Sequence, residues 1–251
     1  MLETRNLTIR FGGHVAVDHV SCAFHPGTLT AIVGPNGAGK TTYFNLISGQ
    51  LRASEGSVLL NGIDITNLPA SARTQRGLGR AFQLTQLFPN LSVLENVRLA
   101  VQSRRRLGLN LWSVWLDHQG TLARAMALVE RVKLGDRADT PASSLPHGDQ
   151  RKLEVAMLMA LEPSVYMFDE PTAGMSVADV PVILDLIRAL KAEPDKTILL
   201  VEHKMDVVRE LANRIVVLHN GQQVADGEPA AVIASPVVQS AYLGIVSEAA
   251  A

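Results

Sequence analysis

Two hydrophobic patterns run along the chain, and the first of them occupies residues 2–65. Leu7 and Ile9 alternate with polar neighbours, which predicts a half-buried strand over Leu2 to Arg10. A second strand is predicted over Val15 to Phe24. The run Leu29 to Val33 is uniformly apolar, as expected of a strand that is buried on both faces. The first part of the chain is therefore expected to be rich in strands.

One helix interrupts this strand-rich part. Residues Tyr43 to Ile47 have helical periodicity, and Gly49 is suited to end the helix because glycine readily adopts the left-handed conformation of a C-cap. A strand is predicted over Ser57 to Leu60, followed by a tight turn of the hairpin type at Asn61-Gly62.

A helical pattern dominates from Leu68 onward. Ser92 and Glu95 have the spacing of a capping box, in which the serine side chain accepts a hydrogen bond from the third backbone N–H of a helix. Apolar strands interrupt the helices at Val165 to Phe168 and Thr197 to Val201, and a hairpin is predicted at Asn220-Gly221. Helices are predicted over residues 69–75, 92–101, 122–132, 152–161, 177–190 and 228–234.

A glycine-rich stretch joins the strand ending at Val33 to the helix that follows. In such a loop the backbone N–H groups can point at an anion, and the positive end of the helix dipole adds to the attraction. Lys40 would reach the β- and γ-phosphates of a nucleotide, Thr41 would ligate Mg²⁺ and Thr42 would bind the α-phosphate. A chance glycine-rich turn is the alternative, but the spacing and both flanks favour a phosphate-binding loop. The loop consists of Gly34, Pro35, Asn36, Gly37, Ala38, Gly39, Lys40, Thr41 and Thr42.

Two carboxylates follow the apolar strand Val165 to Phe168 directly. Buried strands end in this way when their last side chains must reach a bound cation. Asp169 is suited to holding Mg²⁺ through water, and Glu170 to accepting a proton from an attacking water. The strand Thr197 to Val201 brings His203 to the same edge of the sheet. One of the two acids could instead cap a helix, but we do not expect both to do so.

Composition narrows the class of protein. The chain has 251 residues, 47% of them hydrophobic, a net charge of −1 and a pI near 6.7, so no overall basic field attracts nucleic acid or anionic lipid. The single cysteine, Cys22, has apolar neighbours and is expected to be buried, which fits a reducing cytoplasm. We find neither a secretory signal pattern nor an apolar run of the ~18 residues that a membrane span needs. If the protein serves a membrane, other chains are expected to cross it.

Taken together, these motifs resemble the nucleotide-binding subunit of ATP-binding-cassette (ABC) transporters, over about residues 2–244. Within that family the chain is most similar to the ATPase subunits of bacterial branched-chain amino-acid importers. The matching segments are Phe11-Gly12-Gly13, Phe88 to Val97, Glu170 to Met175, Val201-Glu202-His203 and Tyr242-Leu243-Gly244. Related importers of urea, other amides or aromatic compounds share these signatures, and they remain an alternative.

The resemblance implies a fold and a set of partners. The expected fold is α/β, with a P-loop NTPase core, an N-terminal antiparallel β subdomain and an inserted α-helical subdomain. Residues 1–83 and 162–251 would form the nucleotide-binding core, and residues 84–161 the helical subdomain. The expected cofactors are ATP and Mg²⁺. The expected partners are two transmembrane permeases, a second ATPase subunit or another copy of this chain, and indirectly a periplasmic solute-binding protein. The protein would lie on the cytoplasmic side of the inner membrane.

The resemblance also implies roles for individual residues. Phe11 occupies the position of the aromatic residue that stacks on adenine. Gln83 matches the glutamine that touches Mg²⁺ and the attacking water and lies at the joint with the helical lobe. His203 matches the histidine that hydrogen-bonds the γ-phosphate and positions Glu170. Phe11 could instead fill the end of a strand, and a lone histidine is usually structural.

The segment Leu145 to Asp149 is similar to the family signature Leu-Ser-Gly-Gly-Gln, which contacts the ATP of the opposing subunit. Pro146 removes a hydroxyl group and a backbone donor, His147 could supply a side-chain donor, and Gly148 lets the backbone approach. Asp149 places a negative charge near a phosphate unless it points away.

The loop Ala173 to Ser176 departs from the family as well, because it carries serine where aspartate or asparagine is common. Lys204 replaces a frequent aspartate and is interpreted as surface variation. Hydrolysis is still expected, because the residues needed for the chemistry within one subunit are intact, namely Lys40, Asp169, Glu170 and His203.

Two other functions are alternatives to a transporter ATPase. A soluble ABC ATPase acting on nucleic acid or ribosomes usually carries two cassettes or a long coiled-coil insertion, and the sequence has neither. A subunit that binds ATP and dimerises while its partner hydrolyses it is conceivable because of Pro146.

Overall fold

An antiparallel sheet forms the N-terminal part of the protein in the computed structural model, which describes residues 1–81, 87–104, 118–236 and 238–239. The strand order is β2-β1-β4-β5. The alternating pattern of β1 has its expected effect, because Leu7 and Ile9 are buried. The strands of this sheet are β1 (Leu2–Phe11), β2 (His14–Phe24), β4 (Glu55–Leu60) and β5 (Ile63–Asp64).

A second sheet forms the centre of the molecule, with the order β10-β9-β3-β8-β7-β6. Neighbouring strands from β9 to β6 are parallel, and β10 pairs with β9 in the antiparallel sense. The carboxyl ends of β3, β7 and β8 therefore lie at one edge of the sheet. The strands are β3 (Leu29–Val33), β6 (Leu78–Ala81), β7 (Val165–Asp169), β8 (Thr197–Val201), β9 (Arg214–His219) and β10 (Gln222–Gly227).

Both faces of the central sheet are covered. Ile198 and Leu200 of β8 belong to one hydrophobic cluster with the larger helices, whereas Leu199 and Val201 belong to a second cluster with the antiparallel sheet. Successive side chains of a strand point to opposite faces, so a strand buried on both faces needs an unbroken apolar run. This explains why Leu29–Val33 and Thr197–Val201 could be located from the sequence.

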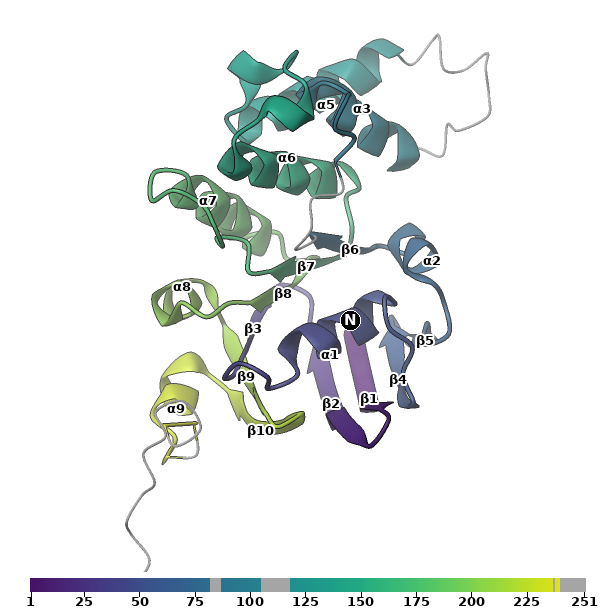
Figure 1. Ribbon diagram of the computed structural model, residues 1–251, viewed down its shortest axis with the longest axis vertical. Coiled ribbons are helices and arrows are strands. Elements are labelled where there is room, and N and C mark those ends of the chain that lie inside the picture. The colour runs from purple at the N-terminus through teal and green to yellow at the C-terminus, as the bar shows by residue number, and fades with distance from the viewer. Residues whose placement is uncertain (82–86, 105–117, 237, 240–251) are drawn as a thin grey trace, which may run out of the picture.

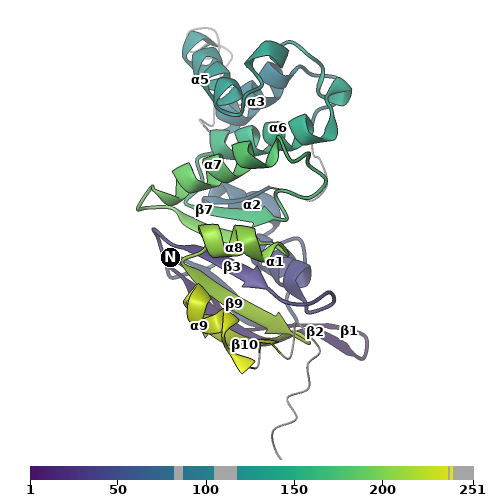
Figure 2. The ribbon, with the colours of Figure 1, turned by 90° about the vertical axis from the view of Figure 1, so that its left-hand side faces the viewer.

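The helices lie on both sides of this sheet. Figures 1 and 2 show α3, α5 and α6 grouped at one end of the molecule, and α1 lies between the two sheets. Buried Ala125, Leu128 and Val129 line one face of α5, as predicted. The α-helices are α1 (Lys40–Ser48), α2 (Ala70–Gln75), α3 (Val93–Arg104), α5 (His118–Arg131), α6 (His147–Ala160), α7 (Val180–Lys191), α8 (Met205–Leu211) and α9 (Pro229–Ile233).

The start of α3 shows the predicted serine cap. The Ser92 hydroxyl accepts a hydrogen bond of 3.2 Å from the Glu95 backbone N–H, and the Glu95 carboxylate pairs with Arg98. Asn96 is fully buried and exchanges two hydrogen bonds with the backbone of Phe88. These contacts attach the segment that carries Phe88 to the first turn of α3.

Several predicted helix boundaries were wrong: α3 ends at Arg104 instead of Val101, α5 begins at His118 instead of Leu122, and the starts of α6 and α7 differ as well. Helix α6 begins at His147, five residues earlier than predicted, because the carbonyl of Pro146 at the N-cap accepts the first hydrogen bond from Gln150 N–H. Helix α7 begins at Val180 rather than Val177, because Ser176 forms a hydrogen-bonded turn with Asp179. The early start of α6 matters for function, since it places the signature residues His147 and Gly148 in the first turn of that helix.

Some predictions fall outside the described residues. Gln83 lies there, as does the C-terminal match Tyr242 to Gly244. Within the described ranges, none of the helices has both the length and the apolar character required to cross a bilayer.

Candidate nucleotide-binding site

The glycine-rich loop opens into a pocket of about 310 Å³ at the carboxyl edge of the central sheet. Glu170, which follows β7, and His203, which follows β8, line the same pocket as the loop. The parallel topology thus brings residues from three distant parts of the sequence to one pocket. The pocket is lined by His14, Ala16, Asn36, Gly37, Ala38, Gly39, Lys40, Thr41, Thr42, Glu170 and His203.

The loop is held between the two sheets at Gly39. This residue has a φ of 95°, and a Cβ atom there would lie 2.5 Å from the carbonyl oxygen of Ala16 on β2. On its other side the Gly221 backbone donates to the Ala38 carbonyl (3.1 Å) and accepts from Asp18 N–H (2.8 Å). Only glycine fits at residue 39, because any side chain would be strained in φ and would overlap β2.

Lys40 begins α1, and its ammonium group is buried beneath the loop. It donates hydrogen bonds to the carbonyl oxygens of Gly34 (2.7 Å) and Pro35 (2.9 Å). Burial lowers the pKa of the Lys40 ammonium, and the carboxylates of Glu170 and Asp169 oppose that change. Lys40 therefore supplies a fixed positive charge where the N-terminus of α1 also favours anions.

Asp169 is fully buried at the end of β7, next to the pocket. Its Oδ2 atom pairs with Arg80 Nη2 on β6 at 2.7 Å, and Arg80 also contacts Asn45, Ser48 and Gln50. Its Oδ1 atom has no hydrogen-bond partner among the described residues. A buried carboxylate oxygen left without a partner suits a bound cation or its water, so the donor set fits Mg²⁺ together with the Thr41 hydroxyl.

Glu170 and His203 form a polar pair that faces the pocket. Glu170 Oε1 lies 2.8 Å from His203 Nε2, and both side chains are partly exposed. Glu170 has a φ of 48°, which is uncommon for a residue other than glycine. The turn after β7 therefore directs the carboxylate into the pocket instead of along the sheet.

Phe11 lies at the end of β1 and is 49% exposed. It pairs across the β1–β2 hairpin with His14, which does line the pocket. Phe11 itself is not among the lining residues, so its predicted contact with adenine stays a prediction. An exposed aromatic ring this close to the pocket is available to a ligand that extends beyond the loop.

The signature residues His147 and Gly148 lie in the first turn of α6 and do not line this pocket. The His147 ring packs on Gly174, where a Cβ atom would lie 3.0 Å from its Cδ2 atom. The signature segment therefore touches the loop Ala173 to Ser176 within the same chain. Neither segment lines the pocket of the phosphate-binding loop.

The negative charge of Asp149 is compensated locally. Its carboxylate lies 2.7 Å from Arg137 and 3.0 Å from Lys152. Lys152 also contacts Asp179 at the start of α7. Burial acts to lower the pKa of Lys152, but the carboxylates of Asp179 and Asp149 outweigh this effect and raise it. Asp149 consequently points into an ion-pair network that joins α6 to α7, and its charge is balanced before any phosphate approaches.

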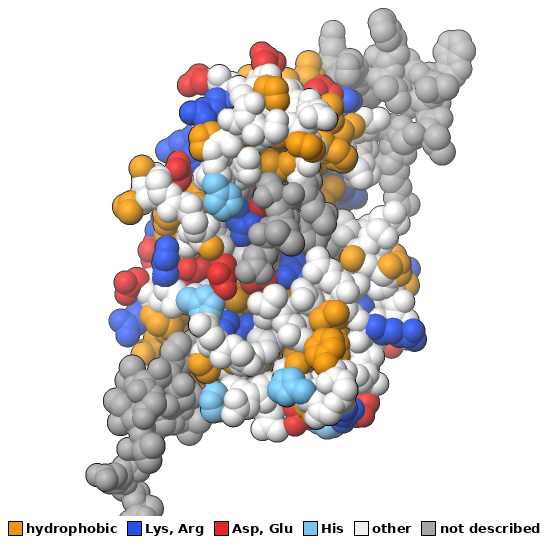
Figure 3. All heavy atoms as spheres, viewed as in Figure 1, with side chains coloured by type: hydrophobic (Ala, Val, Ile, Leu, Met, Phe, Trp, Pro, Cys, Tyr) orange, Lys and Arg blue, Asp and Glu red, His pale blue; other side chains and the backbone are white. Residues whose placement is uncertain are grey.

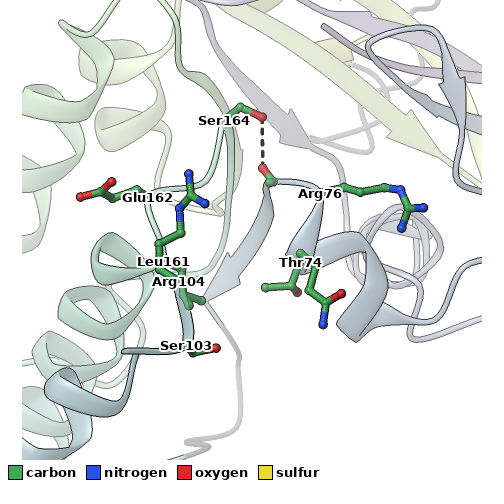
Figure 4. Close-up of a pocket in the computed structure, with 9 residues that line it drawn as sticks. Thr74, Arg76, Ser103, Arg104, Leu161, Glu162 and Ser164 are labelled. Carbon is green, nitrogen blue, oxygen red and sulfur yellow. Dashed lines mark hydrogen bonds between the residues drawn. The ribbon is translucent and has the colours of Figure 1, made fainter. Parts of the chain in front are cut away.

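A larger cavity lies at the opposite edge of the sheet and does not have the groups that a triphosphate needs. It has a volume of about 510 Å³ and borders the starts of β6 and β7. Figure 4 shows the carboxylate of Glu162 and the guanidinium of Arg76 pointing in opposite directions, and the Ser164 hydroxyl donating to the Gly77 carbonyl. Because its charged groups do not converge, this cavity is not the nucleotide site.

A third depression, of about 370 Å³, is mainly apolar and lies between α3, α6 and β6. We call it the α3–α6 groove, and Leu87, Phe88, Ala100, Glu154 and Met157 are among its lining residues. Phe88 is 51% exposed at its rim. Figure 3 shows hydrophobic side chains gathered over the α3 region, whereas positive and negative side chains are interspersed elsewhere on this face.

Two arginines and one histidine of the site were not predicted from the sequence. Arg80, Arg151 and His14 touch or line the site, but nothing in their local sequence distinguishes them from surface residues. In the sequence, Arg80 lies three residues before Gln83. Its burial could have been suspected from the strand pattern, since Leu78 and Ala81 on either side are buried as well.

A phosphate-binding loop between a parallel strand and a helix, facing an acid at the end of another strand, defines the P-loop nucleoside triphosphatases. Residues 17–173 match the family model described as ABC transporter, so the chain belongs to the ABC transporter family. It is 36% identical over 249 residues to the high-affinity branched-chain amino acid transport ATP-binding protein LivG of Escherichia coli (strain K12), covering 97% of this chain and 98% of LivG.

Other relatives agree with this assignment. The chain is 35% identical to the corresponding ATP-binding protein BraF of Pseudomonas aeruginosa, over 97% of this chain and 98% of BraF. A nucleotide-free ATP-binding cassette from an ABC transporter superposes with a TM-score of 0.82 at 30% identity, covering 98% of this chain and 99% of the cassette. The predicted family and the predicted fold class are therefore confirmed.

Proposed function

We propose that the protein is the ATP-binding and ATP-hydrolysing subunit of a bacterial ABC importer for branched-chain amino acids. Relatives that match over nearly their whole length are branched-chain amino acid transport ATP-binding proteins, which supports this choice of solute. The single observation that carries the enzymatic part is the convergence of Lys40, Glu170 and His203 on one pocket.

In this proposal the loop and Lys40 hold the triphosphate. Backbone N–H groups of residues 36–41 and the N-terminus of α1 surround the β- and γ-phosphates, and Thr42 binds the α-phosphate. Thr41, Asp169 Oδ1 and Gln83 would hold Mg²⁺, directly or through water. Once bound, the metal ion would neutralise charge on the phosphate oxygens. The N-terminal aromatic Phe11 stacks on adenine.

Glu170 acts as the general base of hydrolysis. The oxygen of a water molecule bonds to the γ-phosphorus while the bond from that phosphorus to the β–γ bridging oxygen breaks, and ADP leaves with the electron pair. The proton of the water passes to the Glu170 carboxylate. His203 orients that carboxylate through the 2.8 Å contact and hydrogen-bonds the γ-phosphate. The two residues that act on the water, Glu170 and His203, thus already line the pocket.

The second half of each site would come from another subunit. His147 and Gly148, in the first turn of α6, contact the γ-phosphate bound to the opposing cassette, where helix N–H groups attract it. A related cassette has been solved as a dimer in a post-hydrolysis state bound to ADP and Pi; it is 26% identical, with a TM-score of 0.79 over 91% of this chain and 99% of that chain. The partner cassette is another copy of this chain or a homologue.

Dimer closure would drive transport through permeases. Residues 84–161 move as a helical lobe against residues 1–83 and 162–251, and the α3–α6 groove receives a segment of a permease. ATP shifts the equilibrium because it binds the closed dimer better than the open one. Two permeases and a periplasmic amino-acid-binding protein complete the importer, with this subunit on the cytoplasmic side of the inner membrane and no role for nucleic acid.

The test is the substitution Glu170→Gln in the transporter reconstituted in vesicles with its permeases and binding protein. We expect turnover to fall by roughly a hundredfold or more, the range typical of a lost general base, while ATP remains bound. Glu162→Gln is the matched control, since Glu162 is an exposed acid far from the pocket. Unchanged turnover in Glu170→Gln would exclude Glu170 as the base. Uptake of labelled urea but not of labelled leucine would show that the solute is urea and not a branched-chain amino acid.

A further inference from the structure

Arg151, on the second turn of α6, reaches the backbone that follows β7. Its Nη2 atom donates to the carbonyl oxygens of Asp169 (2.8 Å) and Glu170 (3.2 Å), and its Nε atom points to the carbonyl of Pro171 (3.4 Å). One buried guanidinium therefore spans three successive carbonyl groups on either side of the proposed base. A planar group with several fixed donors is suited to such a contact.

The backbone held in this way is the strained part of the site. Glu170 adopts a φ of 48°, in a region that costs free energy for a side chain with a Cβ atom. Its N–H donates to Val201 on β8 (2.9 Å), and its carbonyl also accepts from Ala173 N–H (3.1 Å). Such a conformation persists only where the surrounding structure enforces it. The hydrogen bonds to the carbonyl groups of this turn therefore help to set the direction of the Glu170 carboxylate.

Arg151 is itself fixed by a carboxylate. Its Nη1 atom lies 2.7 Å from Glu154 Oε2, one helical turn further along α6, and both side chains are buried. Burial raises the pKa of Glu154, and the charge of Arg151 opposes that change. Glu154 also lines the α3–α6 groove. The pair thus extends from the groove to the turn that carries Glu170.

We propose that Arg151 is a positioning residue for hydrolysis: anchored by Glu154, it holds the strained turn after β7 so that the Glu170 carboxylate faces the attacking water. This inference rests on the proposed function, because it assigns Arg151 a role only through Glu170. It also gives α6 a second role within its own subunit, separate from that of the signature residues His147 and Gly148 in its first turn.

The position of a base affects the rate of the chemical step more than the binding of substrate. Displacing a reacting group by about 1 Å costs on the order of a hundredfold in rate. Lysine at residue 151 retains a charge but cannot bridge several carbonyls and Glu154 at once, so it should restore only part of the rate. Glu154→Gln keeps one acceptor for Arg151 and should therefore have a smaller effect than removal of the guanidinium.

The experiment compares variants in the reconstituted transporter. For Arg151→Met we expect kcat to fall about tenfold to a hundredfold, with the KM for ATP within about twofold of wild type. Arg151→Lys and Glu154→Gln should be intermediate. Arg124→Met is the matched control, because Arg124 is an exposed arginine that pairs with Glu162 on the surface, and its turnover should be unchanged.

A double-mutant cycle separates positioning from general damage. In single-turnover measurements with labelled ATP, Arg151→Met should add less than about a twofold further loss in a Glu170→Gln background, since two residues that act as a unit are not additive. An equal loss in both backgrounds, or a parallel rise in the KM for ATP, would show a merely structural role and overturn the proposal. If Arg151→Met does not fold, the same cycle with Arg151→Lys decides.

Failure of this inference differs from failure of the proposed function. If the wild-type transporter hydrolyses ATP and Glu170→Gln abolishes turnover but Arg151→Met does not, only the role of Arg151 is excluded. If Glu170→Gln retains wild-type turnover, Glu170 is not the base.

Discussion

Arg80 on β6 and Asp169 on β7 form a buried ion pair, with 2.7 Å between Nη2 and Oδ2. Burial lowers the pKa of Arg80, whereas the neighbouring Asp169 carboxylate opposes that change. The pair ties the edge strand of the central sheet to the acid proposed to face Mg²⁺. It leaves one carboxylate oxygen of Asp169 available, so the arginine holds the acid in place without using all of its acceptors.

Removing one partner of this pair should be costly. We expect Arg80→Met to reduce the free energy of unfolding by about 3–5 kcal/mol, because it leaves a buried carboxylate without its cation. The measurement is urea denaturation monitored by circular dichroism. Arg80→Met combined with Asp169→Asn should recover part of the loss, and a loss below about 1 kcal/mol, as for an exposed pair, would contradict this account.

The thiol of Cys22 should ionise unusually late. Burial raises its pKa from 9.0 to about 11, while a hydrogen bond from Tyr43 acts in the opposite direction. A group whose folded pKa is raised contributes stability that is complete below pH 9 and is lost as the pH rises to 11. Over that range the free energy of unfolding should fall by on the order of 2 kcal/mol more in wild type than in Cys22→Ala.

Alkylation provides an independent measurement of the same property. At pH 10 iodoacetamide should modify Cys22 in the folded protein more slowly than in urea, because only the thiolate reacts and the folded thiol is mostly protonated. Equal rates in both states would show that the thiol is neither buried nor shifted.

His147 should matter for dimerisation and not for binding ATP within its own subunit. Its side chain would donate to the γ-phosphate of the opposing site, so His147→Ala should weaken the ATP-dependent dimer by about 1 kcal/mol, or roughly fivefold in dissociation constant. The measurement is analytical ultracentrifugation of the Glu170→Gln protein with ATP. His25→Ala, at an exposed turn, is the control, and a weaker affinity of the monomer for ATP would point to a site within the same chain.

The α3–α6 groove should transmit ATP hydrolysis to the permeases. Phe88→Glu places a charge at the rim of the groove, and docking of a permease segment there would bury that charge at a high cost in free energy. Transport should therefore be lost, while the ATPase activity of the isolated subunit persists. Uptake of labelled leucine into vesicles is the measurement. Ile63→Glu is the matched control, because Ile63 is an exposed apolar residue on β5 of the antiparallel sheet. Normal transport by Phe88→Glu would mean that the permease docks elsewhere.

The parts of the fold that were predicted correctly are those with strong local signals. The run Leu29–Val33 coincides with β3, and the helix after the loop ends at Gly49 in the left-handed conformation. The positions of Lys40, Glu170 and His203 at one pocket follow from parallel topology, which puts the carboxyl ends of these strands at the same edge.

The parts that could not be predicted depend on contacts between distant segments. Arg80 and Asp169 are 89 residues apart, and no periodicity in either strand reveals that they pair. Arg151 stands in a helix whose polar residues resemble a solvated face, yet it is buried against the turn after β7. The early start of α6 was missed because proline at residue 146 suggests an interruption, although an N-cap needs only its carbonyl group.

The confinement of Gly39 between Ala16 and Gly221 has a consequence for how variants of this subunit should be interpreted. The hairpin between β9 and β10 is remote in the sequence from the phosphate-binding loop, but its backbone is hydrogen-bonded to the loop itself. A substitution at Gly221, where φ is 78° and a Cβ atom would lie 2.9 Å from the Ala16 carbonyl oxygen, should therefore lower nucleotide affinity in addition to straining the hairpin. Screens that score such variants by folding alone would miss their effect on nucleotide binding.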